Sequence, residues 1–324
     1  MDNKRKDELG SLFVFNNKYS NKEFEKVTIQ ELVFLIYTIR AFKEKEILKN
    51  YDYDTKIITF TKVLINKIKL TKKLYIAYDK NTKYPYLDFQ GRAWIFSEKE
   101  FADKAEEYFN KEETFLQMKE LINLNVMNEF GKLHYLGIEK VIIDNGQYNI
   151  EINRNDILPP PDYSNIPARK IPVMNPKLQF AMIYFFQYAY SGKNYKNKAE
   201  VIRGLEANML EEVLRAKFLL PIKLESDNIG IDSNGANVVE KGSKVNFTVI
   251  KDKDSLRWLP AFTDWYEFNK AFDKSKLKSS ICSFEDILTI SKNLEGIVIN
   301  CNGLALKIGE NNRKVIMEFM ENKK

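Results

Sequence analysis

The sequence contains very few residues of the kinds that bind structural metals. Cysteine occurs only at Cys282 and Cys301, without the spacing of a metal-binding pair, and the one histidine is His134. Because a structural zinc ion needs about four cysteine or histidine ligands, these residues are too few for a zinc site. The scarcity of cysteine also favours a reducing compartment. We therefore expect no metal and no cofactor.

Long apolar runs are also lacking. The two most apolar stretches, residues 32–39 and 180–190, are interrupted or flanked by polar side chains. Both are much shorter than the ~20 residues that a membrane-spanning helix needs. The charged residues 1–8 are not followed by an apolar run, unlike the start of a secretory signal. We expect a soluble cytoplasmic protein with no membrane partner.

The charge balance argues against a nucleic-acid partner. The chain has 51 basic and 45 acidic residues, interleaved along its length, for a formal net charge of +6. Lysine supplies 42 of the basic residues, whereas base edges and phosphates are read best by the planar fork of arginine. We expect a solvated surface and no nucleic acid.

Two parts of the chain repeat one order of features. In each, a strand is followed by an apolar step that ends in serine or threonine, then by Glu-Phe, and then by a second strand before an Asn-Gly pair. The first part comprises residues 74–77, 94–97, 100–101 and 141–146, and the second comprises residues 218–222, 258–263, 267–268 and 297–303. The shared residues are mostly apolar or turn-forming, so the repetition indicates a duplicated scaffold and not a duplicated active site.

The proline distribution predicts a domain boundary. A length of 324 residues suggests about two domains, and six of the nine prolines lie within residues 158–177. Because proline removes amide donors and restricts its neighbour, this segment serves as a semi-rigid linker. We predict one domain over residues 1–157 and a second over 178–324. Residues 159–161 could alternatively be a polyproline II ligand for a partner's aromatic groove.

Apolar spacing predicts the main helices. Residues 29–47 are apolar on almost every side, with Thr28 as N-cap and Glu31 three residues on, which predicts a buried helix. Residues 58–70 favour a helix with a strand-like start that leads into a strand over 74–78. Residues 198–216 are apolar at steps of three and four, which predicts an amphipathic helix before a strand over 218–222.

Two hairpins complete the pattern. Asn145-Gly146 and Asn302-Gly303 each lie between apolar runs, and Asn-Gly favours the two-residue type I′ turn. The predicted fold class is α+β, with two tandem, similar mixed α/β domains whose small sheets each end in such a hairpin. Residues 226–242 form a polar, glycine-bearing loop, but its acidic residues lack the spacing of a calcium-binding loop, so we expect no metal there.

The second repeat resembles the N-terminal domain of the SseB (enhanced serine sensitivity) family over about residues 195–320. The resemblance rests on a strand ending in proline (218–222), the step Leu259-Pro260-Ala261-Phe262-Thr263, the helix signal at 283–288 and the segment 296–300. Cys301 stands where the family usually has proline, and the more divergent first repeat has Asp144 in place of the asparagine. The resemblance implies a small bacterial α+β domain without established catalytic residues.

Ser97 and Thr263 have two interpretations. Each follows a buried aromatic residue and precedes a predicted helix, so we expect N-caps, with Glu100 and Glu267 in the first helical turn. A nucleophile would need a base, and His134 has no counterpart in the second repeat. His134 itself is expected to be a surface or partly buried packing residue.

Two classes of function remain open. The first, which we favour, is a non-catalytic interaction or regulatory protein that binds a protein or small ligand through its second domain or a cleft between domains. Its predicted binding residues include the adjacent rings of Trp265 and Tyr266, which one helical stripe cannot bury together; the full set is Phe262, Thr263, Asp264, Trp265, Tyr266 and Asn300. The second class is an enzyme that uses carboxylates or lysines, with Asp264, Glu267, Glu285 and Asp286 as the available acids.

Overall fold

The chain forms two compact units. The computed structural model describes residues 1–16, 20–146, 148–224, 229–231, 237–239, 245–273 and 277–321. Unit 1 consists of Met1–Pro161 with Phe186–Lys196, and unit 2 consists of Asp162–Phe185 with Asn197–Lys324. The division falls inside the proline-rich segment, but a short later stretch of the chain returns to unit 1.

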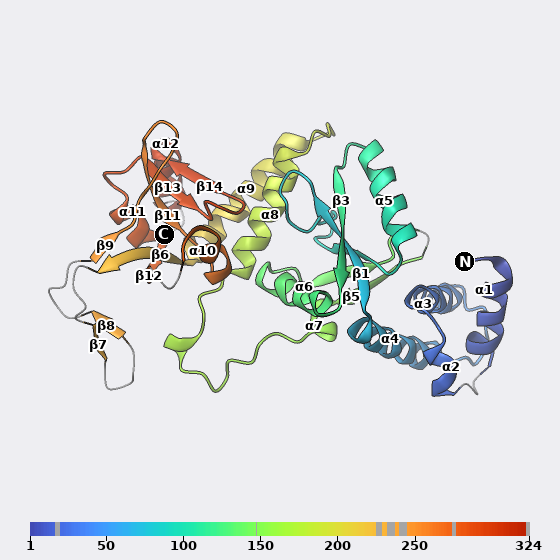
Figure 1. Ribbon diagram of the computed structural model, residues 1–324. Helices are drawn as coiled ribbons and strands as arrows, with labels where there is room; N and C mark the ends of the chain where they lie inside the picture. The colour runs from blue at the N-terminus through green and yellow to red at the C-terminus, as the bar shows by residue number, and fades with distance from the viewer. Residues whose placement is uncertain are drawn as a thin grey trace. The chain divides into compact units, whose positions relative to one another are not determined.

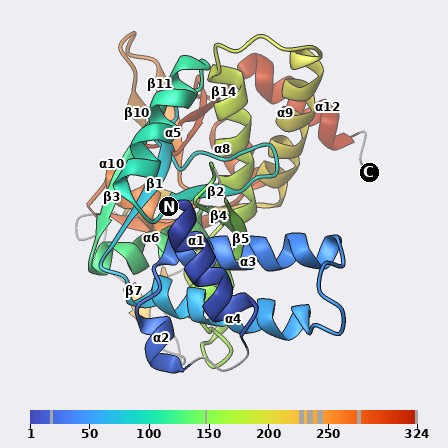
Figure 2. The ribbon, with the colours of Figure 1, turned by 90° about the vertical axis from the view of Figure 1, so that its right-hand side faces the viewer.

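Unit 1 begins with a group of helices, shown in blue in Figure 2. The long helices α3 and α4 pack against each other, and the π-helical turn η1 contacts α3. The helices of the unit are α1 (Asn3–Leu9), η1 (Gly10–Val14), α2 (Asn21–Glu25), α3 (Ile29–Glu44), α4 (Tyr53–Leu70), α5 (Lys99–Lys111), α6 (Leu124–Tyr135) and α7 (Arg154–Ile157).

A five-stranded sheet forms the centre of unit 1. Its strands are β1 (Lys73–Asp79), β2 (Ala93–Phe96), β3 (Leu116–Ile122), β4 (Lys140–Ile143) and β5 (Ile150–Asn153), in the order β3-β1-β2-β4-β5. Only β2 and β4 are parallel; the other neighbours are antiparallel. Figure 1 shows α5 on one face of the sheet and α6 on the other. Both faces are therefore covered, which explains why β2 is buried along its whole length.

Unit 2 contains more, shorter strands. Its helices are η2 (Ala168–Lys170), most of α8 (Pro176–Tyr190), α9 (Lys198–Arg215), α10 (Trp265–Ala271), α11 (Phe284–Ile290) and α12 (Glu310–Glu321). Its strands are β6 (Lys217–Leu224), β7 (Ile229–Ile231), β8 (Asn237–Val239), β9 (Val245–Phe247), β10 (Ile250–Lys251), β11 (Arg257–Ala261), β12 (Lys278–Ser283), β13 (Gly296–Ile299) and β14 (Leu306–Gly309).

The sheets of unit 2 repeat the strand order of unit 1. One sheet has the order β12-β6-β9 and another the order β10-β11-β13-β14, and an antiparallel bridge between Leu219 and Phe262 joins β6 to the end of β11. If the edge strands β9 and β10 are left aside, the strand order across that bridge is β12-β6-β11-β13-β14. These five strands correspond one by one to β3-β1-β2-β4-β5 of unit 1. The single parallel pair, β11 with β13, also occupies the corresponding place.

The predicted α+β class is confirmed, and so are the main elements. Thr28 caps α3 through the expected capping box, in which the Glu31 amide donates to Thr28 Oγ1 over 3.2 Å. The strand-like start predicted for residues 58–70 is wrong, because α4 begins earlier, at Tyr53. The Asp52 side chain accepts from the Thr55 amide over 3.1 Å and so starts the helix before the β-branched residues are reached.

The two hairpins form as predicted, but their turns differ. Residues 144–149 connect β4 to β5 and residues 300–305 connect β13 to β14, so the predicted two-residue type I′ turns are wrong. The left-handed residue is the first of each connection, Asp144 (φ 55°) and Asn300 (φ 56°). Aspartate and asparagine tolerate this conformation better than most residues, and both side chains turn back to the neighbouring strand, as described below.

Three further expectations concern the linker, membrane spans and the polar loop. Residues 158–175 contain only the short turn η2, whereas Pro176 is the first residue of α8, a position that suits proline. Among the described residues no helix is long and apolar enough to cross a membrane. Most of the polar loop 226–242 lies outside the described residues.

Candidate functional site

The ends of the parallel strands carry the same hydrogen-bonded pair in both units. In unit 1, Ser97 follows β2 and Asp144 follows β4; the Ser97 amide donates to Asp144 Oδ1 and the Ser97 hydroxyl to Oδ2, each over 2.7 Å. In unit 2, the Thr263 amide donates to Asn300 Oδ1 over 3.1 Å, and Asn300 Nδ2 donates to Thr263 Oγ1 over 3.0 Å. The carboxyl ends of parallel strands are where α/β proteins place their ligands.

These contacts overturn the expectation that Ser97 and Thr263 are N-caps. The N-cap of α5 is Glu98, which makes no side-chain capping bond, and the N-cap of α10 is Asp264, whose Oδ1 accepts from the Glu267 amide over 2.9 Å. The two hydroxyl groups are held instead by the residue after the next parallel strand. The hydroxyl residues therefore join two strands and leave helix capping to the residue that follows.

In unit 2 the pair is sealed inside a buried polar network. Gln179 of α8 donates from Nε2 to Thr263 Oγ1 over 2.7 Å and to Asp264 Oδ2 over 2.9 Å. Asn175 donates to the Thr263 carbonyl oxygen over 2.6 Å. Gln179, Thr263, Asp264 and Asn300 are each at most 5% exposed. Gln179 Oε1 lacks a hydrogen-bond partner among the described residues, whereas the other polar groups of this network bind one another. Buried groups that are bonded in this way fix a structure and have little capacity left for a ligand.

The six predicted binding residues of unit 2 lie close together but mostly inside. Phe262 packs with Phe268 in a small core, at 5.3 Å between ring centroids, and Trp265 is half-buried against the same Phe268 ring. Tyr266 is the exception, at 52% exposed, with Lys270 Nζ 4.6 Å from the centre of its ring. The adjacent rings therefore do separate, one inward and one outward. The binding role of the six residues stays a prediction.

The four acids named for an enzyme lie on two different helices. Asp264 and Glu267 are buried at the start of α10, where Glu267 Oε1 pairs with Lys270 Nζ at 2.6 Å. Glu285 and Asp286 are exposed at the start of α11, and Asp286 accepts from the Ser283 amide and hydroxyl in a capping box. Three of the four acids thus hold helix starts or an ion pair.

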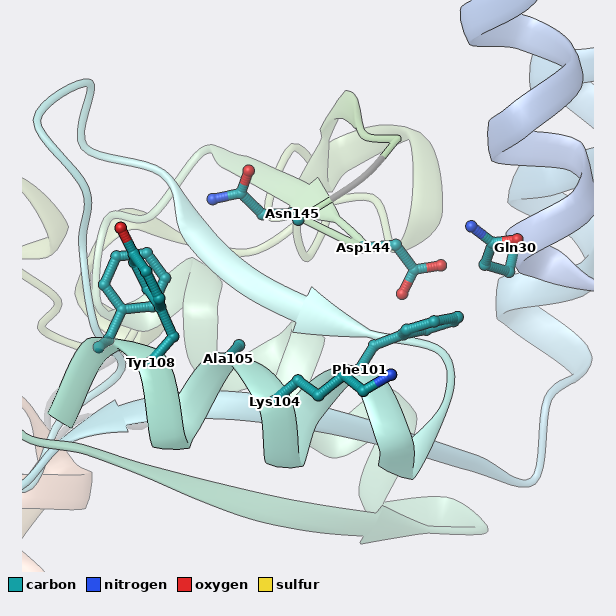
Figure 3. A pocket seen from close by; sticks show the side chains of 9 residues that line it. Gln30, Phe101, Lys104, Ala105, Tyr108, Asp144 and Asn145 are labelled. Carbon is teal, nitrogen blue, oxygen red and sulfur yellow. The ribbon is translucent and has the colours of Figure 1, made fainter. Parts of the chain in front are cut away.

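In unit 1 the corresponding strand ends open into a pocket of about 520 Å³. Its floor is Asp144 with Asn145 and Gly146; one wall is α5 and the opposite wall includes Gln30 near the start of α3. Figure 3 shows the Asp144 carboxylate pointing into the space between these helices. Helix α5 contributes the rings of Phe101, Tyr108 and Phe109, the methyl group of Ala105 and the side chain of Lys104.

Asp144 is electrostatically unusual. Its side chain is 4% exposed, and burial raises the pKa of its carboxyl from the ordinary 3.8 to about 6; the hydrogen bonds from Ser97 oppose this shift, and the charge of Glu98 adds to it. The opposing bonds explain why the carboxyl still ionises near neutral pH. Raised carboxyl pKa values in a pocket are typical of functional sites.

The remaining single residues behave as packing groups. His134 is half-buried, with its Nδ1 3.3 Å from Arg154 Nη2, and burial followed by the Arg154 charge lowers its pKa. This confirms the expected packing role. Cys282 and Cys301 are free thiols, and within the described residues no group of histidine, cysteine and acidic side chains is placed to hold a metal ion.

Comparison with known proteins identifies the second half of the chain. Residues 200–307 match the family model described as the SseB protein N-terminal domain. The second half of the chain therefore contains an SseB N-terminal domain. The matched range runs from α9 to β14, so it contains Thr263 and Asn300 but not the pocket of unit 1. The match does not extend to the first repeat.

Other comparisons add little. No curated protein matches the chain. Among solved structures, a chain titled "Anabaena Tic22 (protein transport)" is aligned over 78% of this chain and 96% of its own, with 9% sequence identity and a TM-score of 0.16. A TM-score of this size is too low to indicate a shared fold.

Sequence reasoning missed the pocket, although one signal pointed to it. The replacement of the family's asparagine by Asp144 was visible in the alignment of the two repeats. A charged residue where a neutral one serves the same turn in the other repeat is a sign of an added role. The contribution of Gln30 and α5 could not be seen, because it depends on how distant segments pack.

Proposed function

We propose that this protein is a non-catalytic binding protein that takes a small ligand into the pocket of unit 1. One observation carries the proposal: the same strand-end pair is sealed by Gln179 and Asp264 in unit 2 but faces an open pocket in unit 1. The volume of about 520 Å³ suits a small organic molecule. In this proposal the strand-end pair of unit 1 faces the bound ligand, and the strand-end pair of unit 2 binds none.

The residues that line the pocket support ligand binding more than catalysis. Among the described residues that line the pocket there is no serine, cysteine or histidine, so a nucleophile with its base is lacking there. Lys104 Nζ is already paired with Glu100 at 2.5 Å. Both oxygens of Asp144 accept hydrogen bonds from Ser97, which holds the carboxylate in one orientation. A fixed carboxylate beside ring surface is the arrangement of a recognition site.

An enzyme remains the second candidate, and Asp144 is the observation in its favour. A carboxyl whose pKa is raised to about 6 is suited to general acid or base catalysis near neutral pH. The two candidates differ in the fate of the ligand. Incubation of the protein with a small-molecule extract of its host, followed by mass spectrometry, should recover the retained compound unchanged. Consumption that the Asp144→Asn variant abolishes would establish the enzyme instead.

The proposed setting is the bacterial cytoplasm. The free thiols of Cys282 and Cys301 suit a reducing compartment. A protein partner at the exposed Tyr266 is compatible with the proposal, because Tyr266 belongs to unit 2 and leaves the pocket of unit 1 unaffected.

A filled pocket tests the proposal. Ala105 lines the pocket from α5, so Ala105→Phe places a ring inside it, whereas Glu107→Phe places the same ring on the exposed face of the same helix. We expect small aromatic fragments, detected by ligand-observed NMR, to bind the wild type and Glu107→Phe and to lose at least tenfold in affinity for Ala105→Phe. Circular dichroism verifies that both variants are folded. Equal binding to all three proteins would refute the pocket.

A further inference from the structure

The Asp144 carboxylate has no cationic partner within the described part of the chain. Its side chain accepts hydrogen bonds from the amide and hydroxyl of Ser97, and no lysine or arginine among the described residues forms an ion pair with it. Lys104, the cationic residue among the described residues that line the pocket, is bound to Glu100 at 2.5 Å and its side chain is 69% exposed. Glu98 adds a second negative charge near Asp144. The local field therefore favours a positive group in the pocket.

The charge at position 144 is not needed for the fold. Asn300 adopts nearly the same φ, 56° against 55°, and its side-chain oxygen accepts from the Thr263 amide as Asp144 Oδ1 accepts from Ser97. The backbone amides after the two strands also donate to equivalent carbonyl oxygens, Asp144 to Ile95 and Asn300 to Ala261, each over 2.9 Å. An amide side chain thus satisfies this turn. A buried carboxylate adds a desolvation cost that the turn does not require.

The α5 wall of the pocket is suited to an apolar body. Phe101 and Phe109 are half-buried in the pocket, and Tyr108 stands beside Phe109 with 5.1 Å between ring centroids. Ring faces attract ammonium groups as well as apolar groups. The pocket therefore presents one anionic point and several aromatic surfaces.

Resting on the proposed function, we infer that the ligand of the unit 1 pocket is an amphipathic amine. Its protonated amino group binds the Asp144 carboxylate, and its apolar body packs on Phe101, Tyr108 and Phe109. The ammonium provides the counter-charge that the described protein groups do not, and Ser97 keeps the acceptor oriented toward it.

Three probes that share a phenyl ring and differ in the charge of their polar group test this inference. Wild-type protein is titrated at pH 7.5 with 2-phenylethylamine, 2-phenylethanol and 3-phenylpropionate, by calorimetry or NMR. We expect the amine to bind at least tenfold more tightly than the alcohol, and the carboxylate to bind most weakly. In Asp144→Asn, which reproduces the residue of unit 2, the preference for the amine should disappear while the affinity for the alcohol is unchanged.

The outcomes separate the two proposals. Equal affinity for amine and alcohol in the wild type, with both lost in Ala105→Phe, would refute the amine and keep the pocket. Binding of the amine to Ala105→Phe as tightly as to the wild type would refute the pocket itself. An amine preference that survives in Asp144→Asn, or tighter binding of the carboxylate, would also overturn the inference. If none of the three probes binds the wild type, the inference of an amine ligand is refuted.

Discussion

Single hydrogen-bonding side chains fix the strand ends of both units. Thr263 and Ser97 each hold the residue that follows the neighbouring parallel strand, across 37 residues of sequence in unit 2 and 47 in unit 1. Such long-range bonds close the sheet at the edge where a ligand would enter. The same geometry is kept with a hydroxyl-amide pair in one unit and a hydroxyl-carboxylate pair in the other.

The Thr263 hydroxyl group should matter more than a helix cap would. In Thr263→Val the hydroxyl is lost with little change of shape, which leaves amide donors of Gln179 and Asn300 without their buried acceptor. We expect the free energy of unfolding to fall by about 1–3 kcal/mol, as measured by urea denaturation. Thr263→Ser keeps the hydroxyl and should lose less. A valine variant as stable as the wild type would show that the network contributes nothing.

Asp144 should make unit 1 less stable at neutral pH than asparagine would. Its pKa is about 6 in the folded chain and near 3.8 when unfolded, so above pH 6 the folded state carries the full cost of the buried charge. As the pH falls from about 6 to about 4, the folded state protonates first and this cost disappears. We expect Asp144→Asn to be more stable than the wild type at pH 7.5 by on the order of 2 kcal/mol, with a difference that vanishes by pH 4.

Urea denaturation of the two proteins at several pH values measures this effect, because other titrating groups contribute equally to both. A difference that stays constant from pH 4 to pH 8 would mean that Asp144 keeps an ordinary pKa. Greater stability of the wild type at pH 7.5 would mean that the charge supports the fold.

At the scale of elements, close approach of strands in unit 2 limits which side chains fit. A Cβ atom on Gly296 in β13 would lie 2.3 Å from the Ile308 carbonyl oxygen of β14 and 2.8 Å from the Trp258 ring of β11. The ring is thus packed directly on the glycine. Gly204, in the interior of α9, has no heavy atom within 4 Å of the equivalent point.

The two glycines should respond in opposite directions to alanine. Gly296→Ala forces backbone and ring apart, and we expect a loss of about 3 kcal/mol. Gly204→Ala meets no obstacle and reduces the entropy of the unfolded chain, so we expect a gain of about 0.5–1 kcal/mol. Chemical denaturation of both variants measures this contrast. Equal effects would mean that the contacts of β13 with β14 and Trp258 relax freely.

Elements with local signals could be predicted from the sequence, whereas their turns and the pocket could not. The capping box at Thr28 and the apolar spacing of residues 198–216 lie within single helices, and both helices formed. The Asn-Gly pairs predicted the hairpins, but the turn conformation depends on bonds from Asp144 and Asn300 to residues far away in sequence. The pocket likewise needs Gln30 and α5 to meet the β4–β5 connection.

The aromatic pair of unit 2 shows the same limit. Adjacent rings at Trp265 and Tyr266 predicted one exposed ring, which the 52% exposure of Tyr266 confirms. Helical spacing decides such a local question. It does not decide whether the surrounding residues are open to a ligand, because Gln179, which covers Thr263, comes from 84 residues earlier.

At the scale of the whole molecule, the sequence order of the chain differs from its division into units. Helix α8 begins in unit 2 and ends in unit 1, where Gln187 accepts from the Leu87 amide over 2.9 Å and donates to the Leu87 carbonyl oxygen over 2.6 Å. Both bonds are buried and link residues 100 positions apart. Residues 186–196 are thus an integral part of unit 1.

Cutting the linker should therefore leave the two pieces associated. We expect a protease site inserted after Ser164, within the irregular segment, to be cleaved without separating the fragments on gel filtration, because the second fragment supplies residues 186–196 to unit 1. Gln187→Ala should weaken the association by removing both buried bonds. Fragments that separate in the absence of denaturant would show that these residues contribute little to unit 1.

The return of the chain to unit 1 also sets an order of events during synthesis. When Pro161 leaves the ribosome, unit 1 still lacks residues 186–196, so Leu87 has no partner for its amide and carbonyl groups. Completion waits until the first segment of unit 2 has also emerged, a delay on the order of seconds at ordinary translation rates. The nascent first domain is thus exposed to proteases and chaperones in an unfinished state, and a translational pause at the point where residue 196 has emerged from the ribosome would help it to fold.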